Sequence, residues 1–192
     1  GAHLVTGMHC TPNTPDGDLV LGADGVRSAF RASLNPDSTP KYSGQVAWRA
    51  VIEDPDAAPL AEVYMGPGRH LVSYPLKGGL RNIVACEDRA SWTAEGWTIE
   101  DRPMNLRAAF ARFPDHVQDW LSRISNVYLW GLFLHPVANR WTDGRLVLLG
   151  DAAHPTLPYL AQGANLALED AVVLARALKT ADLAGYEAHR RA

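Results

Sequence analysis

Hydrophobic positions near the start of the chain form one short, continuous run. Residues 18–24 end at Gly25, as a buried strand does before a tight turn. Residues 28–34 then have the composition of a brief helix, which the Asn35–Pro36 pair would stop. We therefore predict a strand, a tight turn and a short helix in this part of the chain.

The end of the chain has the most regular pattern. Residues 145–150 predict a second buried strand, and residues 151–162 predict a loop with two prolines. From Gly163 to Leu178 the apolar residues recur at helical spacing, which predicts a long helix.

The middle of the chain alternates between apolar and polar residues in short stretches. Turn residues such as Gly66-Pro-Gly68 and Lys77-Gly-Gly79 separate the stretches, which is typical of an antiparallel sheet. The expected strands are 44–52, 61–65, 70–75, 81–86 and 128–134, and the expected helices are 105–113 and 116–124, split at Pro114.

A strand of parallel type near each end, with an antiparallel sheet between them, predicts a discontinuous first domain. We expect residues 1–40 and 136–192 to form part of a Rossmann-like domain, with residues 41–135 inserted as a β-sheet domain. The fold class is then α/β (α+β). Because two strands do not complete a doubly wound sheet, we expect a further segment before Gly1.

Composition narrows the classes of partner. The 192 residues are 47% hydrophobic and 20% charged with a formal net charge of -3, which gives no electrostatic reason to expect nucleic acid or an anionic membrane. No signal peptide or transmembrane run stands out, so we expect a cytoplasmic protein. Cys10 and Cys86 are read as free thiols, and no ligand set for a metal is evident.

The first segment that carries chemistry is Gly22-Ala-Asp-Gly-Val-Arg-Ser-Ala-Phe-Arg31. Its Asp24 follows a strand, at the sheet edge where open α/β folds bind ligands. Gly25 lets the backbone approach a bulky ligand, and Ser28 can cap the next helix. A plain strand–turn–helix with a structural Asp24 is an equally open interpretation.

The second segment runs from Gly150-Asp-Ala-Ala-His to Gln-Gly-Ala-Asn165. Asp151 again follows a strand and can accept hydrogen bonds from ribityl or ribose hydroxyls. Gly163 and Asn165 lie at a helix N-terminus, whose free amides and positive dipole favour negative charge. The alternative is a proline-rich loop followed by a capped helix.

Together, ADGVRSAFR and GDAAHPTLPYLAQGANLALEDA resemble the two internal motifs of the single-component, group A flavoprotein monooxygenases. Salicylate, 3-hydroxybenzoate and 6-hydroxynicotinate hydroxylases belong to that family. The resemblance covers nearly the whole chain, and it implies an FAD-dependent, NAD(P)H-using oxidoreductase that hydroxylates a small aromatic acid with O2.

The resemblance also implies roles for individual residues. Asp24 and Gly25 would lie near the FAD pyrophosphate and ribose, and Arg27 and Arg31 would contact the nicotinamide cofactor. The other residues expected to bind the flavin are Gly150, Asp151, Pro158, Gly163, Ala164 and Asn165. His154 fits the motif, or else it caps or packs.

In the middle sheet, Gly66-Pro-Gly-Arg-His-Leu-Val-Ser-Tyr-Pro75 resembles the substrate-facing segment of the hydroxynicotinate and salicylate hydroxylases. On an alternating strand, His70, Val72 and Tyr74 share one face. A His and a Tyr side by side could orient a phenolate or remove its proton. Tyr159 is a second pocket candidate, and ordinary half-buried strand residues are the alternative.

The Gly-x-Gly-x-x-Gly unit with which the family begins is absent from these residues. We therefore expect the chain alone to bind FAD weakly or not at all, unless a homodimer or a partner chain supplies the missing half. The alternative function is a non-catalytic substrate-domain fragment that folds and associates with itself. A third possible function is that of a related flavoenzyme, such as a halogenase or a reductase that acts on isoprenoid chains.

Overall fold

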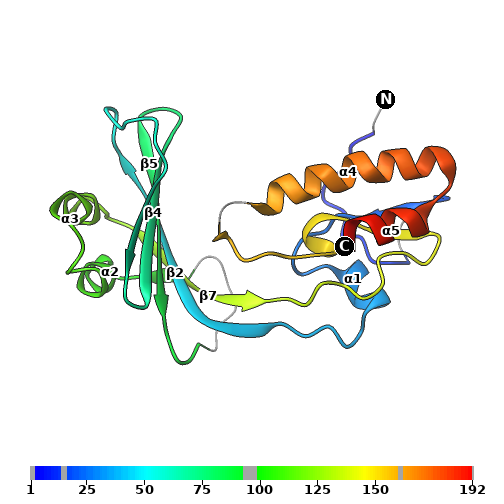
Figure 1. Cartoon of the computed structure of the whole chain (residues 1–192), viewed down its shortest axis with the longest axis horizontal. Helices are drawn as coiled ribbons and strands as arrows, with labels where there is room; N and C mark the ends of the chain where they lie inside the picture. Colours follow the sequence, from blue (N-terminus) through cyan, green and yellow to red (C-terminus); the bar gives the residue numbers. More distant parts are fainter. Residues whose placement is uncertain (1–2, 14–16, 93–98, 160–161, 192) are drawn as a thin grey trace. The chain divides into compact units, whose positions relative to one another are not determined.

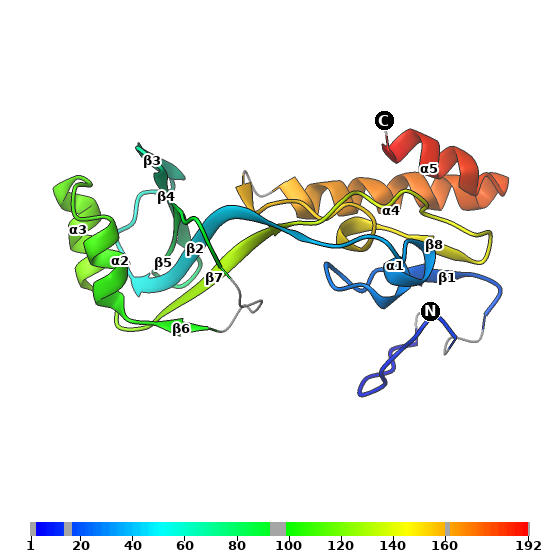
Figure 2. The same cartoon turned by 90° about the horizontal axis from the view of Figure 1, so that it is seen from below.

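The computed structural model describes residues 3–13, 17–92, 99–159 and 162–191 of the 192-residue chain. The chain divides into two compact units, one formed by Gly1–Lys41 with Leu134–Ala192 and the other by Tyr42–Phe133 (Figures 1 and 2). The first unit is therefore discontinuous in sequence, with the second inserted between its two segments. The assignment of flavin binding to the first unit and of substrate binding to the second unit stays a prediction.

The first unit contains a two-stranded parallel sheet, as the patterns at the two ends predict. Its strands are β1 (Val20–Gly22) and β8 (Leu146–Leu148), with Val20 opposite Leu146. The remaining elements are α1 (Ala29–Leu34), the 3-10 turn η1 (Gly150–Ala152), α4 (Gln162–Thr180) and α5 (Leu183–Arg191). Helices α4 and α5 lie side by side in both views (Figures 1 and 2).

Close packing joins β1, β8 and α1. A Cβ placed on Gly22 would lie 2.9 Å from Leu148 Cδ2 and 3.0 Å from Phe30 Cβ, so only glycine lets these elements meet. The core of this unit also contains the fully buried rings of Trp141 and Tyr186.

The second unit is an antiparallel sheet covered by two helices on one face. Its strands lie in the order β3-β4-β5-β2-β7-β6. They are β2 (Lys41–Glu53), β3 (Glu62–Gly66), β4 (Arg69–Leu76), β5 (Leu80–Asp88), β6 (Glu100–Asp101) and β7 (Val127–Leu134). The helices are α2 (Pro103–Ala109) and α3 (Asp115–Ser122).

Alternate residues of the strands build the core of the second unit. Trp48, Leu71 and Ile83 point to the covered face and pack with Phe110 and Leu121 from the helical layer. The residues between them on each strand, His70 and Tyr74 among them, belong to the opposite face.

The structure confirms the expected α/β class and the antiparallel sheet. Neither β6 nor α5 was predicted, and α2 ends at Ala109 although the pattern predicted a helix to residue 113. The chain turns at 110–113 instead, with Phe113 N–H donating to the Phe110 carbonyl. Phe113 is disfavoured in a helix because it precedes Pro114. Within the described residues, no helix is both long and apolar enough to cross a membrane.

Candidate functional site

The turn after β1 is organised by the carboxylate of Asp24. This carboxylate accepts hydrogen bonds from Ser28 Oγ at 2.5 Å and from the Ala29 N–H at 2.8 Å. Ser28 Oγ in turn accepts the Arg31 N–H at 2.7 Å, so two side chains cap the short α1 helix. Asp24 thus has a local structural role, and its expected contact with a cofactor stays a prediction. Gly25 has φ +77°, a conformation that glycine adopts without strain.

The two arginines of this motif lie in different environments. Arg27 is exposed, whereas Arg31 is only 6% exposed. The Arg31 guanidinium donates to the Asp151 carbonyl at 3.0 Å and to the Val26 carbonyl. Burial lowers the pKa of Arg31, against the opposing effect of Asp24 and Asp151. Arg31 therefore ties α1 to the turn after β8, and Arg27 is the better placed of the two for a solvent-borne ligand.

The segment after β8 folds back on the start of α4. Gly150 has φ +58°, and a Cβ there would lie 3.1 Å from the Ala167 Cβ. The exposed Asp151 follows it, and its Oδ1 lies 3.6 Å from where a Cβ on Gly163 would be. Thr156 Oγ1 lies 3.1 Å from that same point. The structure thus brings Asp151 and Gly163, twelve residues apart in sequence, to one place.

The other expected flavin contacts lie on either side of this point. Pro158 is exposed on the loop, while Ala164 and Asn165 are exposed in the first turn of α4. Tyr159, the second pocket candidate, is half-buried next to Pro158. Residues 160–161 of the expected loop lie outside the described residues. The surface near α4 therefore presents a carboxylate, a proline and an open helix turn together.

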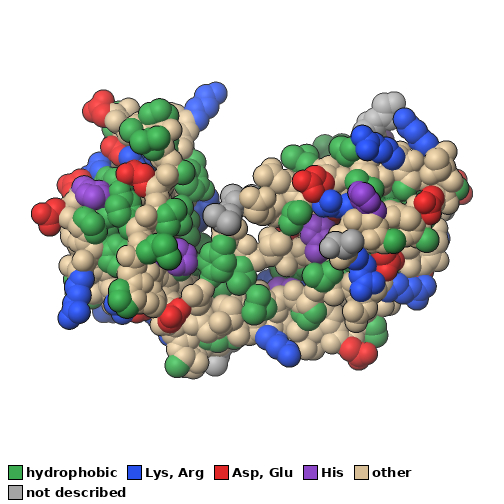
Figure 3. Space-filling view, viewed as in Figure 1, with side chains coloured by type: hydrophobic (Ala, Val, Ile, Leu, Met, Phe, Trp, Pro, Cys, Tyr) green, Lys and Arg blue, Asp and Glu red, His purple; other side chains and the backbone are tan. Residues whose placement is uncertain are grey.

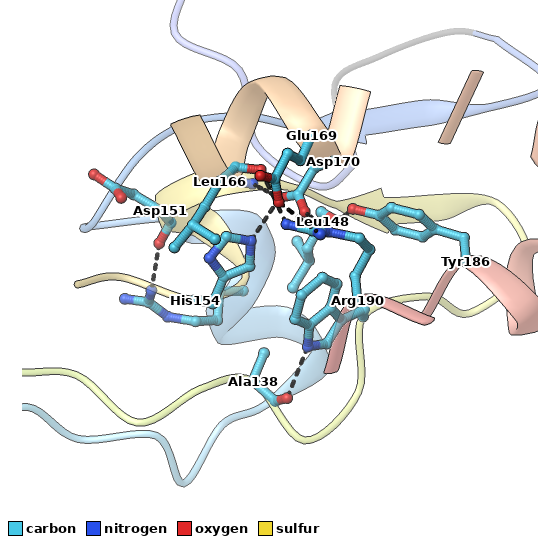
Figure 4. Close-up of polar contacts among 12 residues, drawn as sticks. Ala138, Leu148, Asp151, His154, Leu166, Glu169, Asp170, Tyr186 and Arg190 are labelled. Carbon is cyan, nitrogen blue, oxygen red and sulfur yellow. Dashed lines mark hydrogen bonds and ion pairs between the residues drawn. The ribbon is translucent and has the colours of Figure 1, made fainter. Parts of the chain in front are cut away.

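The buried carboxylate of Asp170 holds the segment after β8 in place through hydrogen bonds. Asp170 on α4 is fully buried and accepts the Gly150 N–H at 2.7 Å (Figure 4). His154 Nε2 lies 2.5 Å from the same oxygen, and Arg190 Nε donates to the other at 2.6 Å. Burial alone would raise the pKa of Asp170, but the hydrogen bonds from His154, Gly150 and Arg190 outweigh it and hold the pKa below its ordinary value.

His154 is held by packing as well as by Asp170. Its ring stacks on Trp141 with centroids 5.0 Å apart. This arrangement matches the packing alternative for His154. From α5, Tyr186 donates its hydroxyl to the Leu148 carbonyl at 2.9 Å, so the end of β8 is anchored to the last helix (Figure 4).

None of the roles predicted from the sequence falls on Asp170, Tyr186 or Arg190. A signal for Asp170 was present, since it occupies a buried position at helical spacing with Leu174 and Ala177 on α4. A charged residue in an apolar stripe indicates a buried ion pair.

On the second unit, strand register places the expected pocket residues on the face of the sheet that α2 and α3 leave uncovered. His70 lies opposite Cys86, and Tyr74 lies opposite Asn82. Burial lowers the pKa of His70, against the opposing effect of Asp88. In Figure 3, hydrophobic side chains reach the surface over this unit between charged side chains of both signs.

His70 and Tyr74 share that face but do not lie side by side. Val72 separates them, and four residues of strand span roughly 13 Å between Cα atoms. Tyr74 is 37% exposed and His70 is half-buried. The pair can therefore bracket a ring from two ends but cannot act as adjacent groups.

Comparison with protein families gives a match over most of the chain. A model described as "FAD binding domain" matches residues 11–186. The 3-amino-4-hydroxybenzoate 2-monooxygenase of Streptomyces cremeus is 40% identical, over 96% of this chain and 47% of its own length. The 6-hydroxynicotinate 3-monooxygenase of Pseudomonas fluorescens is 33% identical, over 91% and 47%. The chain spans about half the length of these curated relatives.

Solved structures show the same likeness. Klebsiella pneumoniae HpxO complexed with FAD and uric acid superposes with a TM-score of 0.76 and 28% identity, over 91% of this chain and 47% of that one. A salicylate hydroxylase substrate complex gives a TM-score of 0.72 and 27% identity, over 82% and 44%.

Proposed function

The chain belongs to the FAD-binding domain family that includes the hydroxybenzoate and hydroxynicotinate monooxygenases, and from that premise we propose that it is part of an NAD(P)H-using aromatic hydroxylase. Its substrate is a small phenolic or hydroxypyridine carboxylate, and O2 is the co-substrate. The observation that carries this proposal is the convergence of Asp151 and Gly163 above the buried Asp170.

The residues around α4 fit the flavin end of FAD. The exposed Asp151 carboxylate can accept hydrogen bonds from ribityl hydroxyls, and Gly163 leaves the backbone open beside it. The amides of Ala164 and Asn165 lie in the first turn of a 19-residue helix, whose positive end favours the electron-rich pyrimidine edge of a flavin. Pro158 would lie against the ring system. When bound, FAD supplies the oxidation chemistry that ring hydroxylation requires.

Arg27 and Gly25 complete the cofactor side of the proposal. Arg27 is exposed and carries a positive charge suited to the phosphates of a nicotinamide cofactor. A Cβ on Gly25 would meet no atom within 4 Å, so the backbone there is open to a ligand. The exposed Asp24 supports this surface by capping α1, and the buried Arg31 supports it through the Asp151 carbonyl.

His70 and Tyr74 supply the substrate side. Because burial lowers the pKa of His70, its imidazole is neutral near pH 7 and can accept a proton from a phenol. Deprotonation raises the electron density of the ring that is to be hydroxylated. Tyr74 would orient the other end of the substrate.

The cofactor assignment is tested in a protein that contains the whole family fold, because the chain alone is expected to bind FAD weakly. The measurement is its visible spectrum after incubation with excess FAD and gel filtration. Retained flavin bands in the wild type that are lost in Asp151→Ala would support the site. The exposed Asp119→Ala on α3 serves as the matched control and should retain flavin as the wild type does. Retention that is equal in wild type and Asp151→Ala would contradict the assignment.

The substrate assignment is tested in a protein that contains the whole family fold. We expect His70→Ala to lower aromatic-dependent NAD(P)H oxidation by about 10²–10⁴-fold, the usual contribution of a general base. Tyr74→Phe should raise KM more than it lowers kcat. His189→Ala, an exposed substitution on α5, is the control. Unchanged hydroxylation in both variants would refute the assignment of these two residues.

A further inference from the structure

The uncovered face of the sheet carries two polar residues to which no role has been given. Strand register arranges this face in three rows across β4, β5 and β2. The rows are His70–Cys86–Ala47, then Val72–Val84–Arg49, and then Tyr74–Asn82–Val51. A histidine thus lies at one end of this face, and a tyrosine and an amide lie at the other. The arginine lies on β2, in the central row beside Val72 and Val84.

Asn82 is fully buried, and half of its side chain has no partner. Its Oδ1 accepts a hydrogen bond from Arg49 Nε at 3.1 Å. That bond fixes the orientation of the amide, because the reverse orientation would set two donors against each other. The Asn82 NH2 group then has no hydrogen-bond partner among the described residues. Buried donors of this kind are rare in native proteins and indicate an acceptor that is absent.

Arg49 also has hydrogen-bond donors that the described residues leave unpaired. Its side chain is exposed, and the bond to Asn82 engages only Nε. Within the described part of the chain, Arg49 makes no ion pair with a carboxylate, whereas Arg69 and Arg81 on the neighbouring strands do. The two terminal nitrogens of the guanidinium therefore remain free to bind an anion in a bidentate manner.

We propose that Arg49 and Asn82 form the subsite that binds the carboxylate of the aromatic substrate. This inference rests on the proposed function and adds an orientation to it. The carboxylate takes the terminal guanidinium nitrogens of Arg49 and the unpaired amide of Asn82. The ring then covers Val72 and Val84, and its hydroxyl points toward His70.

The test measures binding directly and needs neither flavin nor turnover. The ligands are 3-hydroxybenzoate and its neutral isostere 3-hydroxybenzamide, titrated into the purified chain by calorimetry. We expect the wild type to bind the acid at least about tenfold more tightly than the amide, which is the effect of one charge-assisted hydrogen bond. Arg49→Gln should remove that preference and leave the affinity for the amide unchanged.

Two further variants separate recognition from folding. Asn82→Asp, which is isosteric, places a negative charge against Arg49 and should reverse the preference toward the amide. Arg112→Gln, on the exposed turn after α2, removes a positive charge away from this face and should change neither affinity. Thermal unfolding of each variant shows whether the fold is retained.

Three results would overturn the inference: equal wild-type affinity for acid and amide, no binding of either, or equal loss of both in Arg49→Gln. None of these depends on FAD, so the flavin spectrum still tests the proposed function separately. Conversely, discrimination of the two ligands through Arg49, together with equal flavin retention in wild type and Asp151→Ala of the whole family fold, would keep the subsite and contradict the cofactor assignment.

Discussion

Asp170→Asn removes one charge from the interior of the first unit and nearly nothing from its volume. In the wild type this side chain satisfies the Gly150 N–H, His154 and Arg190. Asparagine keeps one acceptor but turns an NH2 donor toward one of these donors. The Arg190 side chain, only 13% exposed, is left without its buried counter-charge.

Breaking a buried ion pair by removing one partner costs about 3–5 kcal/mol of unfolding free energy. In a chain of this length that corresponds to a fall of roughly 10 °C in Tm. Glu169→Gln is the matched control, because Glu169 pairs with the same Arg190 but is 59% exposed, and such pairs contribute about 0–1 kcal/mol. Since the chain has two compact units, urea unfolding should be paired with hydrogen exchange at the Gly150 amide, which reports the first unit alone.

Asp170 also makes the unfolding free energy depend on pH. Because the folded pKa of Asp170 is lowered, its stabilising effect is present above the unfolded value of about 3.9 and is lost as pH falls through the folded pKa. Wild type and Asp170→Asn should therefore differ at pH 7 and converge in acid. A difference below about 1 kcal/mol at pH 7, or unaltered exchange at Gly150, would refute the view that this network fixes the loop.

Three other substitutions or modifications follow from the geometry. Gly150→Ala should lower the unfolding free energy by about 1–3 kcal/mol, because it combines φ +58° with a 3.1 Å approach to Ala167, and chemical denaturation measures it. Ser28→Ala should cost about 0.5–2 kcal/mol through loss of the α1 cap, by the same assay, and no measurable loss would mean that Asp24 caps α1 alone. Burial raises the pKa of the Cys86 thiol to about 11, so a thiol reagent should modify the exposed Cys10 rapidly at pH 8 and Cys86 only on unfolding; rapid labelling of both would contradict this.

Much of the fold can be predicted from the local pattern of apolar and polar residues, because that pattern matches which side chains are buried in the folded chain. Residues 146–149 are apolar because β8 is buried in the first unit, and residues 70–75 alternate because one face of β4 packs on the helical layer. Helix α5 escaped prediction because Gly185 lowers its helix propensity and its only buried residue is Tyr186, so it shows no apolar stripe.

The candidate site was less predictable from sequence than the fold. The motif positions indicate Asp151 and Gly163, which the structure brings together, but no pattern shows that Arg31 turns inward or that Asp24 caps a helix. These roles depend on which partner a polar side chain meets across the fold. Likewise Asn82 reads as an ordinary strand residue, and only the register with Tyr74 and Val51 shows that it lies on the uncovered face.

The pairing of β1 with β8 has a consequence for the order of folding. The sheet unit is contiguous in sequence and can make its contacts as soon as Phe133 has been synthesised. The strand at Val20, by contrast, finds its partner more than a hundred residues later. At about 5–20 residues per second, that interval is on the order of ten seconds on the ribosome. During this time β1 lacks its β8 partner, although nearly the whole insert between the two strands has already been synthesised.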